Sequence, residues 1–181
     1  MIRFRLIYFF ITALLVSSCV KEIMELPPAT QSGANTFGCK IDGTFWVPAG
    51  FGIIPTAPKL EARMLPDNTL IINARNFSRS PTETEFEIII KNVIAPGEYL
   101  LNENTGHPNL GASYAYYVRR RFTPLNEWIT TSQFNGKVTI TKTEMGSHGI
   151  TSGLFEFYAK GIIDTSQVIH ITDGRFDIRL L

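Results

Sequence analysis

The sequence predicts an all-β fold, a single antiparallel β-sandwich or barrel of about ten strands. Three observations predict it. Apolar and polar residues alternate in many short segments, turn sequences separate these segments at regular spacing, and almost no part of the chain after the leader has a helical period. The many Thr, Ile, Phe and Tyr residues also favour strands.

Short sequences rich in Gly, Pro, Asn and Asp mark the turns. Asp42-Gly43 is typical of a two-residue hairpin, and Pro66-Asp67-Asn68 predicts a second hairpin. Pro96-Gly97 and Asn135-Gly136 each introduce a strand, and Asp173-Gly174 is interpreted as a hairpin turn between the last two strands. The predicted strands are Phe37–Ile41, Thr44–Val47, Lys59–Leu65, Thr69–Phe77, Thr84–Val93, Glu98–Asn102, Ser113–Arg121, Glu127–Ser132, Lys137–Thr143, Ile150–Lys160, Gln167–Ile171 and Arg175–Leu180.

Alternation within a strand predicts which side chains point into the core. In Ile150–Lys160, for example, we expect Phe155 and Phe157 inside and Glu156 and Lys160 outside.

The first residues have the features of a secretory signal, residues 1–18. Arg3 and Arg5 precede an apolar run, Leu6–Val16, that is too short to span a bilayer as a helix. The run ends in Leu-Val-Ser-Ser before Cys19, which resembles the bacterial lipobox. We therefore expect cleavage before Cys19 and acylation of its thiol and amino group, which would anchor the protein to a membrane.

Three regions follow from this interpretation: the signal peptide, the lipidated Cys19 with a flexible tether over residues 19–35, and a β domain over residues 36–181. Val20, at the position after the lipidated cysteine, is compatible with transport to an outer membrane. Whether the domain lies on the periplasmic face or at the cell surface stays open.

The overall charge excludes partners that bind by bulk electrostatics. The whole chain has 17 basic and 16 acidic residues, a net charge of +1. Because Arg3 and Arg5 belong to the leader, the mature chain carries a net charge of −1. We therefore expect no nucleic-acid partner.

Cysteine and histidine offer little for catalysis or metal binding. With Cys19 acylated, Cys39 has no disulfide partner, and its apolar neighbours favour a small buried residue over a nucleophile. The three histidines, His107, His148 and His170, lack metal-ligand spacing, so turn or surface positions are favoured over a zinc site assembled in space. No metal or other cofactor is expected.

Acidic residues on strands are the remaining candidates for catalysis. Glu85, Glu87, Glu144 and Glu156 would have to pair across strands to act as a glycosidase acid and base. Their alternation with apolar residues instead indicates solvated strand faces, so no catalytic residue is assigned.

One segment, Ser113–Phe122, combines tyrosines with consecutive arginines. On a strand, Tyr114, Tyr116, Val118, Arg120 and Phe122 share one face, and Tyr117, Arg119 and Arg121 share the other. Aromatic rings beside guanidinium groups suit sugars or anionic glycans, and Trp128 would extend such a platform. The alternative is an ordinary strand with a tyrosine-rich core side.

Several segments resemble an uncharacterised lipoprotein family of Bacteroidota. They are Leu26–Gly43 followed by Phe45–Pro48, then Val138–Lys142, Ser152–Phe157 and Ile171–Asp177. The resemblance covers nearly the whole mature chain in order. It implies a lipid-anchored envelope protein with a domain of unknown function, and it supplies no active-site residues.

Two functions from different classes therefore remain. The first is a non-catalytic envelope module that binds a glycan, a small ligand or a partner protein. The second is an envelope hydrolase whose residues meet only in the folded chain, and a structural or assembly role cannot be separated from the first.

Overall fold

The computed structural model describes residues 25–50, 58–78, 82–120 and 126–181. These residues form eleven strands and no helix, which confirms the predicted all-β class. No helix long and apolar enough to cross a membrane occurs in this described part. The strands are β1 (Thr36–Ile41), β2 (Thr44–Trp46), β3 (Leu60–Met64), β4 (Leu70–Asn76), β5 (Thr84–Ile90), β6 (Gly97–Leu101), β7 (Tyr114–Arg119), β8 (Asn126–Ile129), β9 (Gly136–Thr143), β10 (Ile150–Gly161) and β11 (Val168–Arg179).

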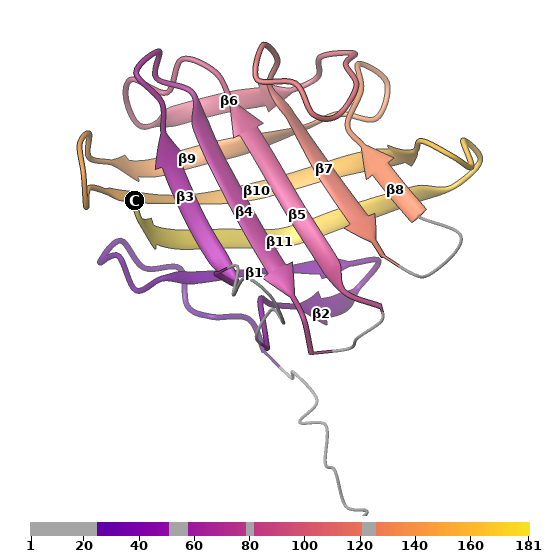
Figure 1. Ribbon diagram of the computed structural model, residues 1–181, viewed down its shortest axis with the longest axis horizontal. Coiled ribbons are helices and arrows are strands. Elements are labelled where there is room, and N and C mark those ends of the chain that lie inside the picture. The colour runs from indigo at the N-terminus through magenta and orange to yellow at the C-terminus, as the bar shows by residue number, and fades with distance from the viewer. Residues whose placement is uncertain (1–24, 51–57, 79–81, 121–125) are drawn as a thin grey trace, which may run out of the picture.

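The strands form one curled antiparallel sheet that folds over on itself into two layers. The front layer has the order β8-β7-β5-β4-β3, and the back layer has the order β6-β9-β10-β11-β1-β2. Strand β10 belongs to both layers, because residues 151–157 pair with β9 while Lys160 and Gly161 pair with β8. In Figure 1 the strands of the front layer cross those of the back layer at a steep angle.

The two layers also meet where the chain ends. The Leu181 amide donates to the Ala62 carbonyl of β3 at 3.0 Å, beside a parallel bridge between Ala62 and Leu180. This contact joins β3 to the end of β11, so the sheet is partly closed and its apolar faces enclose one core.

Aromatic side chains from both layers fill that core. Phe86 of β5 contacts Trp46 at 4.7 Å between ring centroids, Tyr117 at 4.6 Å and Phe37 at 5.9 Å. Phe155 lies 5.0 Å from Phe37 and, as predicted, points inward. Each fully buried ring of this kind contributes about 1.5–3 kcal/mol of transfer free energy.

Two Asp-Gly pairs that look alike in the sequence adopt different structures. Asp42 and Gly43 have φ values of 48° and 83° and connect β1 to β2, which confirms the predicted hairpin. The predicted hairpin at Asp173-Gly174 is wrong, because β11 runs through it without a break. Asp173 has φ 53° and lies in a β-bulge, where two residues of β11 face one residue of β10.

A buried carboxylate holds the segment before β1 against the domain. Asp177 of β11 is 1% exposed and accepts five hydrogen bonds from residues 30–34, in addition to one from the Ser152 hydroxyl. Burial alone would raise the pKa of Asp177, but these bonds, led by that of the Thr30 hydroxyl, hold its pKa well below the usual range. The last part of the predicted tether, from Thr30 to Asn35, is therefore fixed to the domain.

Candidate functional site

Strand alternation divides the predicted tyrosine and arginine cluster between two faces of the front layer. Tyr114 and Tyr116 pack with Val118 on the outer face. Tyr117 belongs to the core, where its ring lies 5.6 Å from that of Trp128 and its hydroxyl hydrogen-bonds the Arg119 side chain. The structure therefore does not bring Trp128 beside Tyr114 and Tyr116. Arg121 lies outside the described residues, as does Cys19.

The four rings of this cluster are also buried. Their exposed fractions are 0% for Tyr114, 6% for Tyr116, 3% for Tyr117 and 4% for Trp128. A sugar needs an open ring face to stack on, so these rings do not form the expected platform. Arg120 is the accessible member, with a side chain 58% exposed that bonds Glu85 at 2.9 Å.

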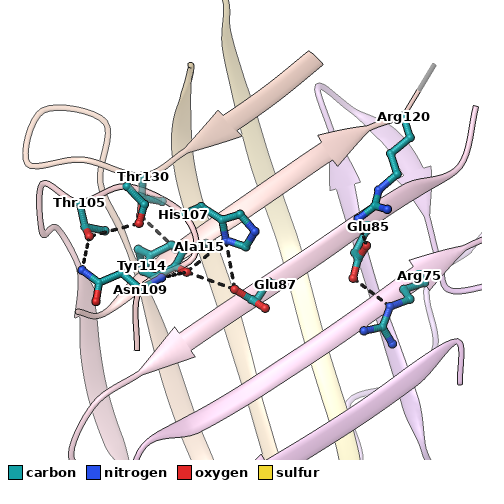
Figure 2. Close-up of polar contacts among 11 residues, drawn as sticks. Arg75, Glu85, Glu87, Thr105, His107, Asn109, Tyr114, Ala115, Arg120 and Thr130 are labelled. Atoms are coloured by element: carbon teal, nitrogen blue, oxygen red, sulfur yellow. Dashed lines mark hydrogen bonds and ion pairs between the residues drawn. The ribbon is translucent and has the colours of Figure 1, made fainter. Parts of the chain in front are cut away.

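A histidine from the loop between β6 and β7 covers the outer tyrosines. The His107 ring stacks on Tyr116 with 3.7 Å between centroids and an angle of 8°. Its Nδ1 lies 3.2 Å from both the Tyr114 hydroxyl and Glu87 Oε1. Figure 2 shows the side chains of His107, Tyr114 and Glu87 converging above β5 and β7. The sequence placed His107 in a loop but gave no sign of these partners.

The Tyr114 hydroxyl is the centre of this His107–Glu87–Tyr114 cluster. It donates to Glu87 Oε1 at 3.1 Å and accepts from the Asn109 amide at 3.1 Å. Burial, opposed by the Asn109 bond and assisted by the negative charge of Glu87, raises the pKa of Tyr114 to about 12. The hydroxyl therefore stays protonated at neutral pH and acts as a donor to Glu87.

An ion-pair network continues along the same outer face. Arg75 bonds Glu85 at 2.8 Å and Glu61 at 3.0 Å, and its remaining nitrogen donates to the Pro58 carbonyl at 3.0 Å. Arg120 occupies the second oxygen of Glu85, as Figure 2 shows. Because every charged atom of Arg75 and Glu85 has a partner, the network holds four strands together rather than facing a ligand.

The other candidate carboxylates do not approach this network. Glu144 lies just after β9 and pairs with Lys142 at 3.0 Å, while Glu156 on β10 lies 3.8 Å from Lys137. Both belong to the back layer. The structure therefore does not join Glu144 or Glu156 with Glu85 and Glu87 in one site.

Cysteine and the remaining histidines occupy separate places. Cys39 is fully buried, as predicted, and burial raises the pKa of its thiol, which disfavours the nucleophilic thiolate. His148 lies in the turn after β9, and His170 stacks on Tyr158 of β10. Across the described ranges, no three His, Cys, Asp or Glu side chains gather as metal ligands.

Two surface hollows lie away from these residues. One, of about 340 Å³, is bordered by Met64, Met145 and the chain end at Leu181. The other, of about 300 Å³, lies over β9, β10 and β11 on the outer face of the back layer, and Lys137, Leu154 and Arg175 line it. Nothing in the sequence pointed to this second hollow, although alternation along β10 puts Leu154 and Tyr158 on the same outward side as Glu156.

Comparisons of the chain with protein-family models, with curated proteins and with solved structures found no match. The family resemblance noted in the sequence therefore stays a prediction, and function has to be argued from the geometry.

Proposed function

We propose that this protein is a lipid-anchored envelope protein whose β domain is a non-catalytic binding module. Acyl chains on Cys19 would hold it to an outer membrane, and the domain would bind a glycan or an envelope protein. The lipobox-like sequence before Cys19 supports the anchor, and the geometry of the domain supports binding rather than catalysis.

The observation that carries the proposal is the fixed segment at Asp177. Residues 30–34 bond this carboxylate directly, so the chain is attached to the domain from Thr30 onward. Cys19 precedes Thr30 by only 11 positions in the sequence. A chain of that length spans at most about 40 Å when fully extended. An anchor at Cys19 would therefore keep the domain close to the bilayer.

The polar clusters of the domain support a role without catalysis. The groups most suited to acid–base chemistry, His107 and Glu87, bond each other and Tyr114, and Tyr116 lies directly beneath the imidazole. Neither residue lines either of the two surface hollows described above. Catalytic groups need a concave site that holds the reacting atoms, whereas this cluster fastens a loop to a sheet.

Metabolic labelling with a fatty acid tests the anchor. The wild-type protein should incorporate the label and sediment with membranes, and Cys19→Ala should lose both properties. Cys39→Ala is the matched control, since it removes the other cysteine of the chain and should leave labelling unchanged. Persistent labelling of the Cys19 variant, or a soluble wild-type protein with an unmodified amino terminus, would contradict the proposal.

An envelope hydrolase is the second candidate, and the contact between His107 and Glu87 is the observation that favours it. Chromogenic esters and glycosides test it. Hydrolysis by the wild-type protein that disappears in His107→Ala would replace the binding role with an enzymatic one.

A further inference from the structure

The hollow of about 300 Å³ on the back layer lies beside the bulge in β11. Gly174 lies opposite Phe155, and a side chain at this position would meet the Phe155 ring at 2.4 Å. The Phe155 ring therefore packs against Gly174 on the core side of the sheet, while Asp173 of the bulge lies outward, 49% exposed. Bulges often redirect side chains at functional sites in this way.

Polar groups of both charges surround the hollow. Arg175 is fixed by a bond from its Nε to the Asp173 carbonyl at 3.1 Å, and its two terminal nitrogens have no hydrogen bond to any residue that the structure describes. Lys137 lies 3.0 Å from Glu98 and 3.8 Å from Glu156. These side chains can offer hydrogen-bond donors and acceptors to the same ligand.

The charges at the hollow balance. Lys40, which bonds Asp173 at 2.8 Å, joins Lys137 and Arg175 as the cations. The anions are the carboxylates of Asp173, Glu156 and Glu98, so there are as many anions as cations. A site without excess charge attracts no ion by bulk electrostatics, so its geometry suits a neutral ligand with many hydroxyl groups.

An open aromatic ring lies on the same face. Tyr158 is two residues beyond Glu156 on β10 and is 47% exposed. Its ring stacks on His170 with 4.0 Å between centroids and an angle of 5°. The His170 amide in turn donates to Asp42 of the β1–β2 hairpin at 2.8 Å, so the stack is held in place before any ligand arrives.

From this arrangement we infer that the hollow and Tyr158 together bind a neutral saccharide. One sugar unit fills the hollow above Leu154, and its hydroxyls bond Arg175, Lys137 and the carboxylates. The next unit lays its apolar face on the Tyr158 ring. This inference rests on the proposed binding function and names its site and ligand class.

Binding of defined hexasaccharides to the mature lipoprotein in detergent tests the inference. The probes are neutral glucan, xylan and mannan hexasaccharides, with hexagalacturonate as the acidic probe. We expect at least one neutral probe to bind. Tyr158→Ala and Arg175→Ala should each weaken it about tenfold or more, and Tyr158→Phe, which keeps the ring, should stay within about twofold. Thermal unfolding of each variant shows that the fold is intact.

Arg120→Ala is the matched control, because it removes an exposed arginine of the front layer and should leave binding unchanged. Failure of every probe to bind at millimolar concentration would overturn the inference. So would a preference for hexagalacturonate, or a loss of binding in Arg120→Ala but not in Tyr158→Ala. Fatty-acid labelling of the same preparations reports on the anchor separately, so either proposal can fail without the other.

Discussion

Two tyrosine–histidine stacks of nearly the same geometry lie on opposite layers of this protein. In the front layer His107 covers Tyr116 at 3.7 Å, and in the back layer Tyr158 and His170 are cross-strand partners whose rings stack at 4.0 Å. The tyrosine is 6% exposed in the first stack and 47% exposed in the second. In the first stack a loop residue lies over a tyrosine of the sheet, whereas in the second the two rings project side by side from neighbouring strands.

The surroundings of each stack explain this difference in exposure. The loop between β6 and β7 brings His107 over the front layer, where Glu87 and Tyr114 bond it. On the back layer no described loop carries a ring over Tyr158, and the β1–β2 hairpin supports His170 through its backbone. A buried stack of this kind stabilises the fold, whereas an exposed one offers a surface to a ligand.

Truncating the two tyrosines should separate these roles most strongly. Tyr116→Ala should lower the free energy of unfolding by about 3 kcal/mol or more, as for other large buried side chains. Tyr158→Ala should lower it by less than about 1 kcal/mol, since its ring is half exposed. Urea denaturation of both variants measures the difference. Equal losses would show that the second stack is also structural.

Removing the negative charge of Asp177 in the back layer should have the next largest effect. Asp177→Asn replaces an acceptor of six hydrogen bonds by an amide whose NH₂ group faces donors. We expect a loss of about 2–3 kcal/mol in the free energy of unfolding. The loss should also show as faster proteolysis at residues 30–34, which bond the carboxylate.

The same carboxylate should make stability depend on pH. The pKa of Asp177 is lower in the folded than in the unfolded protein, so the unfolded state binds more protons in acid. Its stabilisation is therefore complete above the ordinary aspartate pKa of about 4 and is lost as pH falls below it. The urea midpoints of the wild type and Asp177→Asn should lie closer together at pH 3 than at pH 6. A constant gap between them would contradict this assignment.

Two arginines of the front layer should give the smallest effects, and unequal ones. Arg75 has a side chain 16% exposed and bonds two carboxylates and a carbonyl. Arg75→Ala should cost about 1–3 kcal/mol because it removes the partner of the Glu61 carboxylate and one of the two partners of Glu85. Arg120→Ala should cost under about 1 kcal/mol, as for an exposed ion pair. The thermal midpoints of the two variants test this order.

The hairpin and the bulge show how far local sequence determines this fold. Asp42-Gly43 and Asp173-Gly174 both favour a positive φ at the aspartate, and both aspartates adopt one. A hairpin and a bulge share this local requirement. Which one forms depends on whether the chain reverses at the pair or continues between two neighbouring strands of the sheet. At Asp173 those neighbours are β1 and β10, and the residues that pair with β11 lie far from Asp173 in the sequence. Strand positions and faces were therefore predictable, but this connection was not.

The candidate site shows a similar limit. Alternation correctly placed Tyr114 and Tyr116 on one face and Tyr117 on the other. It could not show that His107 would bury the outer pair, because that contact depends on how a loop folds back over the sheet. Tyr158 was not singled out from the sequence, because the exposure of its ring depends on the absence of a covering loop among the described residues.

The attachment at Asp177 also determines how the domain responds to a pull on its amino-terminal end. The first backbone pair of β1, Thr36 with Asp177, involves the residue whose carboxylate bonds residues 30–34. Tension on the amino terminus therefore meets these bonds together before it reaches the ladder between β1 and β11. The strand is thus protected from being peeled away one residue at a time, which gives the domain mechanical resistance at its amino-terminal end.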